Sequence, residues 1–286
     1  MTPGALLPDD VALGPVRLRV ADRSRTRAWL ESVLGMEWLG DEGGRSRFGA
    51  RGGAPLVEVR EQPGARPIPR GGRPGIYHYA LLLPERAFLG RFLRHLDAHG
   101  FGHADSDHLV SEAIYLVDPD GVTVEVYADR PRELWRHRGD EIAMATLPID
   151  HDDLSLAGAG GAWAGLPPGT RMGHVHHHVG DLELAERFYV DGLGFGVTTR
   201  GYSGALFVAA AGYHHHVGLN TWAAARAPAG PEDAGLDEWT LVVPGASERF
   251  AVAQRLSGQG VPLASSPDAV RAADPWGIQV SVTARE

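Results

Sequence analysis

The stretch Gly173–Tyr189 reads GHVHHHVGDLELAERFY. Its first part alternates between apolar and histidine residues, as a strand does when side chains point to opposite faces in turn. Asp181 then stands where a helix N-cap belongs, and the apolar residues after it recur at helical spacing. The stretch therefore predicts a strand followed by a helix. One face of that strand carries three histidines, His174, His176 and His178.

The same strand–helix unit occurs four times. Its strands begin at Pro15 (PVRLRV), His78 (HYALLL), His174 (HVHHHV) and Glu238 (EWTLVV). The first and third starts lie 159 residues apart and the second and fourth 160, which favours duplication over a chance run of strand–helix pairs. Short strands with turn signals follow each helix. The sequence thus predicts an α+β fold of four βαβββ units, paired into two cup-shaped domains of curled mixed sheet.

The spacing also predicts domain boundaries. We expect residues 11–130 to form an N-terminal pair of units and residues 171–286 a C-terminal pair. The interval 131–170 contains the Gly/Ala/Pro-rich stretch LAGAGGAWAGLPPGT and is expected to be the linker between them.

Composition restricts the chemistry. The 286 residues include no cysteine and no lysine, which excludes disulfides, thiolate metal sites and amine nucleophiles. The net charge of −9 argues against nucleic acid or an anionic membrane as a partner. No apolar run is long enough for a membrane span, and the first ten residues lack the features of a leader, so we expect a cytoplasmic protein. Histidine stands out, since seven of the 14 lie between His174 and His216.

Strand alternation predicts a metal site in the C-terminal pair. The first and last strand of each unit contribute one inward position each, here His174, His216, Glu238 and Ser281. Two imidazoles and one carboxylate leave coordination positions open, which suits Fe(II) or Mn(II) and is acceptable to Zn(II). A lone strand histidine is usually a core residue, but clustered imidazoles repel once protonated. We therefore expect His174, His216 and Glu238 to bind a metal, with the choice among residues 214–216 open.

The N-terminal pair gives a weaker set. Its inward positions are Pro15, Glu58, His78 and Glu125. A proline cannot be a ligand, and glutamate at the rim of a last strand is common. We expect this pair to be a degenerate copy without a functional metal.

At this point the chain resembles a known superfamily. The resemblance rests on the repeated units and on four motifs, MATLPID (144–150), GHVHHHVGDLELAERFY (173–189), ALFVAAAGYHHHVGLNTW (205–222) and EWTLVVP (238–244). The chain resembles the vicinal oxygen chelate superfamily, which includes glyoxalases, bleomycin-resistance proteins and extradiol dioxygenases. More narrowly, it resembles two-domain catechol 2,3-dioxygenase-like proteins. This resemblance implies a non-haem Fe(II) enzyme that cleaves a catecholic ring beside its hydroxyl groups with O₂.

The resemblance also implies a histidine that takes and returns protons. By position, His176, His214 and His215 are candidates, with His178 more distant. Tyr213 and Tyr202 are expected to orient substrate or O₂. The sequence departs from the family in one respect, because Ser281 stands where the carboxylate ligand is expected and Glu238 would have to replace it.

Two other functions remain open on this scaffold. One is metal-dependent isomerase or lyase chemistry of the glyoxalase type, without O₂. The other is a small-molecule binding or resistance protein without turnover. The sequence leaves the oligomeric state open, and cup-shaped domains are compatible with a homo-oligomer.

Overall fold

Each repeated segment folds locally as its sequence predicts. The Asp22 carboxylate accepts a hydrogen bond of 2.9 Å from the backbone N–H of Arg25, and Asp181 does the same for Leu184 at 2.8 Å. These contacts satisfy amide groups that the first turn of a helix leaves unpaired. Gly35 ends the first helix with a left-handed φ of 69°, which glycine adopts without steric cost. The computed structural model, which describes residues 6–285, accordingly contains four βαβββ units.

The four units share one order of elements. The first unit comprises β1 (Ala12–Val20), α1 (Arg23–Trp29) continued by η1 (Leu30–Leu34), β2 (Glu37–Glu42), β3 (Arg45–Gly49) and β4 (Pro55–Glu61). The second comprises β5 (Gly75–Leu82), α2 (Arg86–His99), β6 (Ala104–Asp107), β7 (Ser111–Val117) and β8 (Thr123–Asp129). The third comprises β11 (Arg171–His178), α4 (Leu182–Glu186) continued by η3 (Arg187–Gly192), β12 (Gly196–Thr199), β13 (Ala205–Ala209) and β14 (Val217–Asn220). The fourth comprises β15 (Gly235–Val243), α5 (Ala246–Gly258), β16 (Leu263–Ser265), β17 (Ala269–Ala273) and β18 (Gln279–Ala284).

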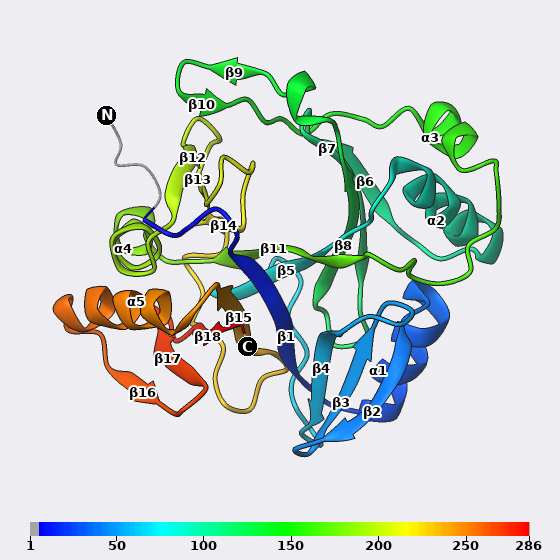
Figure 1. Cartoon of the computed structure of the whole chain (residues 1–286). Coiled ribbons are helices and arrows are strands. Elements are labelled where there is room, and N and C mark those ends of the chain that lie inside the picture. Colours follow the sequence, from blue (N-terminus) through cyan, green and yellow to red (C-terminus); the bar gives the residue numbers. More distant parts are fainter. Residues whose placement is uncertain (1–5, 286) are drawn as a thin grey trace.

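These strands form two eight-stranded mixed sheets (Figure 1). The first and fourth units make one sheet, here called the outer sheet, in the order β16-β17-β18-β15-β1-β4-β3-β2. The second and third units make the other, the inner sheet, in the order β12-β13-β14-β11-β5-β8-β7-β6. In each sheet the first strands of the two units pair antiparallel at the centre, and each has its own unit's last strand parallel beside it. The expected fold class, four units paired into two curled mixed sheets, is confirmed.

The expected partners within each sheet are corrected. The sequence led us to pair neighbouring units within residues 11–130 and 171–286, whereas the sheets join the first unit to the fourth and the second to the third. The physical reason is that strands pair through backbone N–H and C=O groups, and these groups are the same in every strand. Spacing shows that units repeat, but it does not say which pairs of units share a sheet.

Residues 131–170 are not an extended linker. They contain η2 (Arg132–Leu134), β9 (His137–Arg138), β10 (Glu141–Ile142) and α3 (His151–Ala157). Helix α3 packs on α2, where two glycines let the backbones meet: a Cβ added at Gly90 would lie 2.1 Å from the carbonyl oxygen of Leu154. This segment is therefore docked on the second unit.

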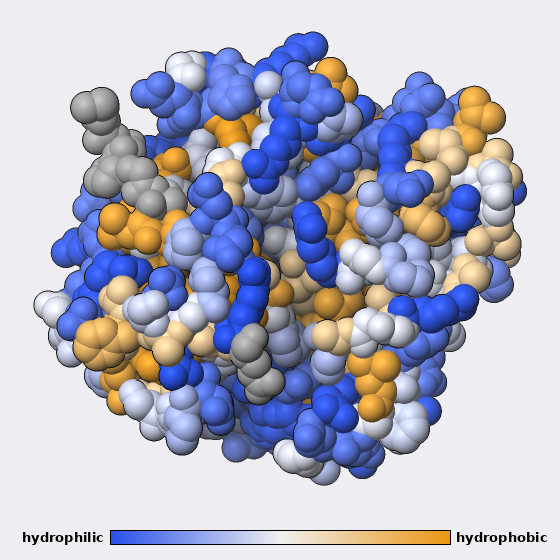
Figure 2. Space-filling view, viewed as in Figure 1, coloured by the Kyte–Doolittle hydropathy of each residue, from blue (hydrophilic) through white to orange (hydrophobic). Residues whose placement is uncertain are grey.

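One apolar core runs through both sheets. It includes Trp239 on β15, Tyr79 on β5 and Tyr189 on η3, and all three side chains are buried. Figure 1 shows α1, α2 and α3 at one end of the two sheets and α4 and α5 at the other. On the face in Figure 2, hydrophobic residues lie in small separate groups among hydrophilic ones. Within residues 6–285, none of the helices has the length and apolar character needed to cross a membrane.

The contact between α2 and α3 gives a stability prediction. Gly90→Ala should lower the free energy of unfolding by about 1–3 kcal/mol, because the backbone atoms that oppose the new methyl group cannot rotate away. Gly258→Ala, also in a helix but with open space around it, is the matched control and should leave stability unchanged or raise it by up to about 1 kcal/mol. Urea unfolding of both variants checks this. Equal stability of the two variants would contradict the docked arrangement.

Candidate metal centre

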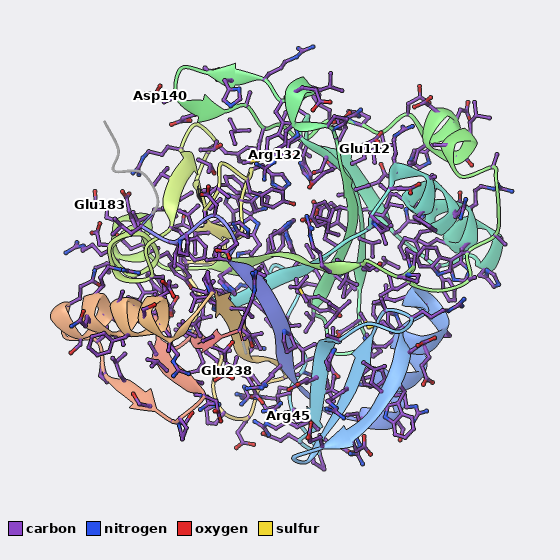
Figure 3. All side chains as sticks on the ribbon, viewed as in Figure 1. Arg45, Glu112, Arg132, Asp140, Glu183 and Glu238 are labelled. Carbon is purple, nitrogen blue, oxygen red and sulfur yellow. The ribbon has the colours of Figure 1, made fainter. Side chains whose placement is uncertain are left out.

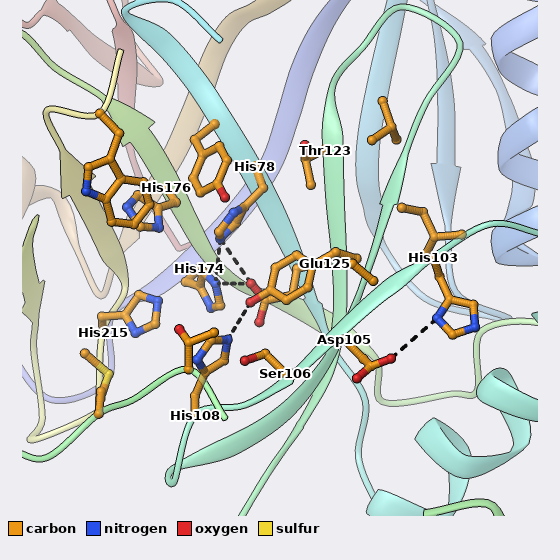
Figure 4. Close-up of a pocket in the computed structure, with 18 of the residues that line it drawn as sticks. His78, His103, Asp105, Ser106, His108, Thr123, Glu125, His174, His176 and His215 are labelled. Atoms are coloured by element: carbon orange, nitrogen blue, oxygen red, sulfur yellow. Dashed lines mark hydrogen bonds and ion pairs between the residues drawn. The ribbon is translucent and has the colours of Figure 1, made fainter. Parts of the chain in front are cut away.

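Three buried side chains converge on the pocket-lining face of the inner sheet (Figure 4). His78 lies on β5, Glu125 on β8 and His174 on β11, three strands that are neighbours in the sheet order. Ala80 pairs with both His174 and Glu125, which brings the three strands level. Alternation then turns all three side chains to one face. Residues from two units thus meet because β5 and β11 pair.

Their ligand atoms form a nearly equilateral triangle. The Nε2 atoms of His78 and His174 each lie 3.1 Å from Oε2 of Glu125 and 3.2 Å from one another. Such a triangle is one face of an octahedron whose centre lies about 2.2 Å from each corner, close to the bond length from a first-row metal to nitrogen or oxygen. The three residues form a group able to hold a metal ion. The donor set fits the two-histidine, one-carboxylate arrangement that the sequence predicts, with His174 as expected and with His78 and Glu125 in place of His216 and Glu238.

The charge state of this group suits a cation. Burial would raise the pKa of Glu125, but the adjacent imidazoles of His174 and His78 hold that pKa well below its usual range. Burial lowers the pKa of His78, which keeps its imidazole neutral and its Nε2 lone pair available. The Nδ1 atoms of His78 and His174 are buried and have no partner among residues 6–285. The Glu125 carboxylate and the Nε2 atoms of His78 and His174 therefore meet at one point.

The triangle lies in a cavity of about 740 Å³. A volume of this size is usual for small-molecule sites. Aromatic side chains form much of its wall, and polar groups stand among them. The lining includes Tyr77, His108, Tyr115, His176, Tyr202, Phe207, His215 and Trp222.

Two of the predicted catalytic histidines line this cavity. His215 packs its ring against that of His174, with centroids 4.1 Å apart, and His176 packs against His78 at 4.9 Å. Burial, followed by neighbouring imidazoles, lowers the pKa of both His176 and His215 well below the usual value. Both rings are therefore neutral in the pocket.

The other two predicted catalytic residues lie behind the pocket wall. His214 is fully buried and places Nε2 2.9 Å from Oδ1 of Asp129. The Tyr213 hydroxyl donates to Oδ2 of the same carboxylate at 3.0 Å. Neither residue lines the cavity, so each acts on it only through a neighbour.

The predicted ligands His216 and Glu238 do not join His174. The ring of His216 stacks on Phe195, with centroids 6.0 Å apart, and does not line the cavity. Glu238 lies on β15 in the outer sheet (Figure 3), where it pairs with Arg17 and, at 2.8 Å, with Arg271. Of the three expected ligands, only His174 belongs to the group found in the structure. His78 and Glu125 take the places that were expected for His216 and Glu238.

Two physical reasons account for this correction. Residues 213–216 lie in bends before β14, after a turn in which Ala211 and Gly212 have left-handed φ, so strand alternation does not apply to them. The inward positions His78 and Glu125 were identified but assigned to a sheet without His174. The wall residues Tyr115 and His108 carried no sequence signal that we recognised.

In the outer sheet, Arg17 lies between the two carboxylates that face the corresponding region. Its guanidinium pairs with Glu58 at 2.7 Å and with Glu238. An arginine thus supplies positive charge there. The expectation that the N-terminal pair is a degenerate copy is corrected for His78 and Glu125, which belong to the triangle in the inner sheet. Within residues 6–285, only the inner-sheet triangle offers three closely spaced ligand residues.

Comparisons with known proteins agree with this architecture. The family model described as Glyoxalase/Bleomycin resistance protein/Dioxygenase superfamily matches residues 12–126. A catechol-2,3-dioxygenase of Bacillus subtilis (strain 168) is 39% identical over 271 residues, which cover 93% of this chain and 95% of that protein.

Solved structures share the fold at low identity. A putative dioxygenase from Bacillus subtilis subsp. subtilis str. 168 matches with a TM-score of 0.64 and 12% identity, over 96% of this chain and 84% of that one. Glyoxalase I from Zea mays matches with a TM-score of 0.56 and 16% identity, over 96% and 92%. At such identities these likenesses concern the fold alone. The extended identity to the Bacillus protein carries the assignment further: the chain belongs to the catechol-2,3-dioxygenase-like branch of the glyoxalase/bleomycin resistance/dioxygenase superfamily.

Proposed function

We propose that this protein is an extradiol dioxygenase, which holds Fe(II) through His78, Glu125 and His174 and cleaves a catecholic ring with O₂. The observation that carries the proposal is the 3.1–3.2 Å triangle of two imidazole nitrogens and one carboxylate oxygen, on buried residues that line a cavity. The kinship with a catechol-2,3-dioxygenase supports the substrate class.

One side of the triangle is left free of protein ligands. Ala80 pairs with Glu125 in the second unit, and His176 pairs with Gly218 at the matching place in the third. Gly218 has no side chain to offer a fourth ligand. Fe(II) bound there would supply adjacent positions for the two catechol oxygens and O₂, and both O₂ atoms enter the ring-opened product, so that no external reductant is required.

The walls fit a flat aromatic substrate. Tyr77 and Trp222 meet edge to face with centroids 5.8 Å apart, and Phe207 faces the ring of His215 at 4.9 Å. These rings supply apolar surface and exclude water from the reacting region.

Two side chains that line the pocket are placed to take part in proton transfer. His215 lies beside the ligand His174, and its buried neutral imidazole can take a hydroxyl proton from the substrate. Tyr115 donates its hydroxyl hydrogen to Nε2 of His108 at 2.6 Å, because Nδ1 of His108 donates to the carbonyl of Ala145 at 2.7 Å. The Tyr115 oxygen is thereby held as an acceptor that faces the pocket.

The first prediction here concerns metal binding. Glu125→Gln should weaken Fe(II) or Mn(II) affinity at least about 100-fold, because the carboxylate is the single anionic ligand. Glu238→Gln, the matched control in the outer sheet, should retain one equivalent of metal. Titration followed by elemental analysis measures both. Stoichiometric metal in Glu125→Gln, or its loss in Glu238→Gln, would contradict the ligand assignment.

The second concerns turnover. The Fe(II)-loaded protein should consume one O₂ for each catechol and give a yellow semialdehyde, with no product under anaerobic conditions. Glu125→Gln should show no uptake above background, and Glu238→Gln should retain turnover. An oxygen electrode and absorbance spectra make these measurements. Fe(II)-loaded protein that binds catechols yet never consumes O₂ would exclude ring cleavage and favour the glyoxalase-type or binding alternatives.

A further inference from the structure

Two buried hydrogen-bond chains end on the two pocket histidines. One runs from Asp129 through His214 to His215, and the other runs from the backbone of Trp222 through Asn220 to His176. Each chain begins at a group whose hydrogen-bonding role is fixed by its chemistry. The position of the proton on each imidazole can therefore be worked out step by step.

The first chain starts at a carboxylate, which only accepts. Asp129 Oδ1 lies 2.9 Å from Nε2 of His214, so a neutral His214 ring carries its proton on Nε2 and has a lone pair on Nδ1. Nδ1 of His215 lies 2.7 Å from that Nδ1 and must donate to it. The Nε2 of His215 is then left with a lone pair. It makes no hydrogen bond within residues 6–285 and belongs to a residue that lines the cavity.

Two tyrosines anchor the same carboxylate. Tyr213 donates to Oδ2 of Asp129 at 3.0 Å and accepts from the hydroxyl of Tyr127 at 2.7 Å. Both hydroxyls are buried, and burial raises the pKa of each phenol well above its usual value. They therefore stay protonated and act as donors in one direction, toward Asp129. The hydrogen bond from Tyr213 therefore holds the Asp129 carboxylate next to Nε2 of His214.

The second chain starts at a backbone N–H, which only donates. The amide of Trp222 donates to Oδ1 of Asn220 at 3.1 Å, so the orientation of this side-chain amide is fixed. Its Nδ2 therefore faces Nε2 of His176 at 2.9 Å and donates to it. The proton of His176 is then on Nδ1, as in His215, but Nε2 of His176 already accepts from Asn220, so the N–H of His176 is the group left for the pocket.

We propose that Asp129, through His214, and Asn220 are positioning residues that fix the Nδ1-protonated tautomer on both pocket histidines and thereby leave opposite hydrogen-bonding groups free in the pocket. His215 presents a lone pair on Nε2, and His176 presents an N–H on Nδ1. This inference rests on the proposed function for its consequence. In turnover the O–H bond of a catechol hydroxyl breaks and its proton moves to Nε2 of His215, while His176 donates a hydrogen bond to an anionic oxygen and cannot act as the base.

Gly218 makes room for the second of these roles. A Cβ at this position would lie 2.8 Å from Nδ1 of His176, so the imidazole rests directly on the glycine. The ring is thus held on one side by Gly218 and on another by Asn220. The third unit uses the position that carries Glu125 in the second unit to seat a histidine.

Two isosteric exchanges test the proposal, one in each hydrogen-bond chain. In Asp129→Asn, the new amide N–H faces His214 and should reverse the chain, so that His215 carries its proton on Nε2. In Asn220→Asp, the new carboxylate accepts from His176, which should move that proton to Nε2. Each variant is the matched control for the other, since neither touches the other chain. Asp268→Asn, on the exposed surface, controls for the loss of one negative charge.

The readout is ¹⁵N NMR of the histidine rings in metal-free and Zn(II)-loaded protein, with resonances assigned by single His→Asn variants. The wild-type spectrum should show the proton of His215 on Nδ1 and that of His176 on Nδ1. Asp129→Asn should move the first and leave the second, and Asn220→Asp should do the converse. A wild-type proton on Nε2 of either ring, or no movement in a folded variant, would overturn the proposal.

Kinetics of the Fe(II)-loaded protein give a second readout. Asp129→Asn should lower kcat about 100-fold or more with KM and metal content nearly unchanged, as expected when a base holds the wrong tautomer. Failure of the proposed function stays distinguishable, because the spectra require no turnover. The expected tautomers in a protein that never consumes O₂ would overturn ring cleavage and leave the positioning inference intact. Where a variant does not fold, the wild-type spectrum alone decides.

Discussion

The antiparallel pairing of β5 with β11 is the contact on which the candidate site depends. It joins the second unit to the third and sets Ala80 opposite His174, while β8 sets Glu125 opposite the same alanine. A shift of one residue would turn every side chain of one strand to the other face and separate the three ligand atoms. The same pairing places His176 opposite His78. Backbone register at the centre of one sheet therefore positions the metal ligands and the pocket histidines together.

Alternation placed the inward positions His78, Glu125 and His174 correctly and failed at His216, which precedes its strand; the sequence could not supply which units share a sheet. The eight inward positions divide between the sheets in a new way. The inner sheet takes His78, Glu125, His174 and the third-unit position near His216 and Gly218, and the outer sheet takes Pro15, Glu58, Glu238 and Ser281. Strand edges are chemically alike, so the spacing of units does not identify which strands pair at the centre of a sheet. With the observed partners, the same reasoning gives two imidazoles and a carboxylate in one cavity.

The outer sheet shows what the scaffold does without these ligands. The register that sets Glu125 beside Ala80 sets Ser281 beside Thr240, and Ser281 is buried without a hydrogen-bond partner among residues 6–285. Arg17 holds Glu58 and Glu238 instead. Two nearby carboxylates repel unless a cation lies between them, and a guanidinium carries that charge permanently. The fourfold repeat thus gives both sheets the same backbone framework. In the outer sheet an arginine side chain balances the carboxylates, and in the inner sheet the side chains leave that role to a bound metal ion.

The segment YHHHVGLN (213–220) explains why a motif can be recognised while its residues are misassigned. Tyr213 and His214 turn back to Asp129, His215 faces the pocket and His216 packs on Phe195, so four consecutive residues take three different directions. Buried polar chains of this kind are seldom the most stable way to fill a core, because each group costs desolvation that an apolar side chain avoids. Their retention beside a cavity is therefore better explained by the direction they impose on two imidazole protons than by the stability they add.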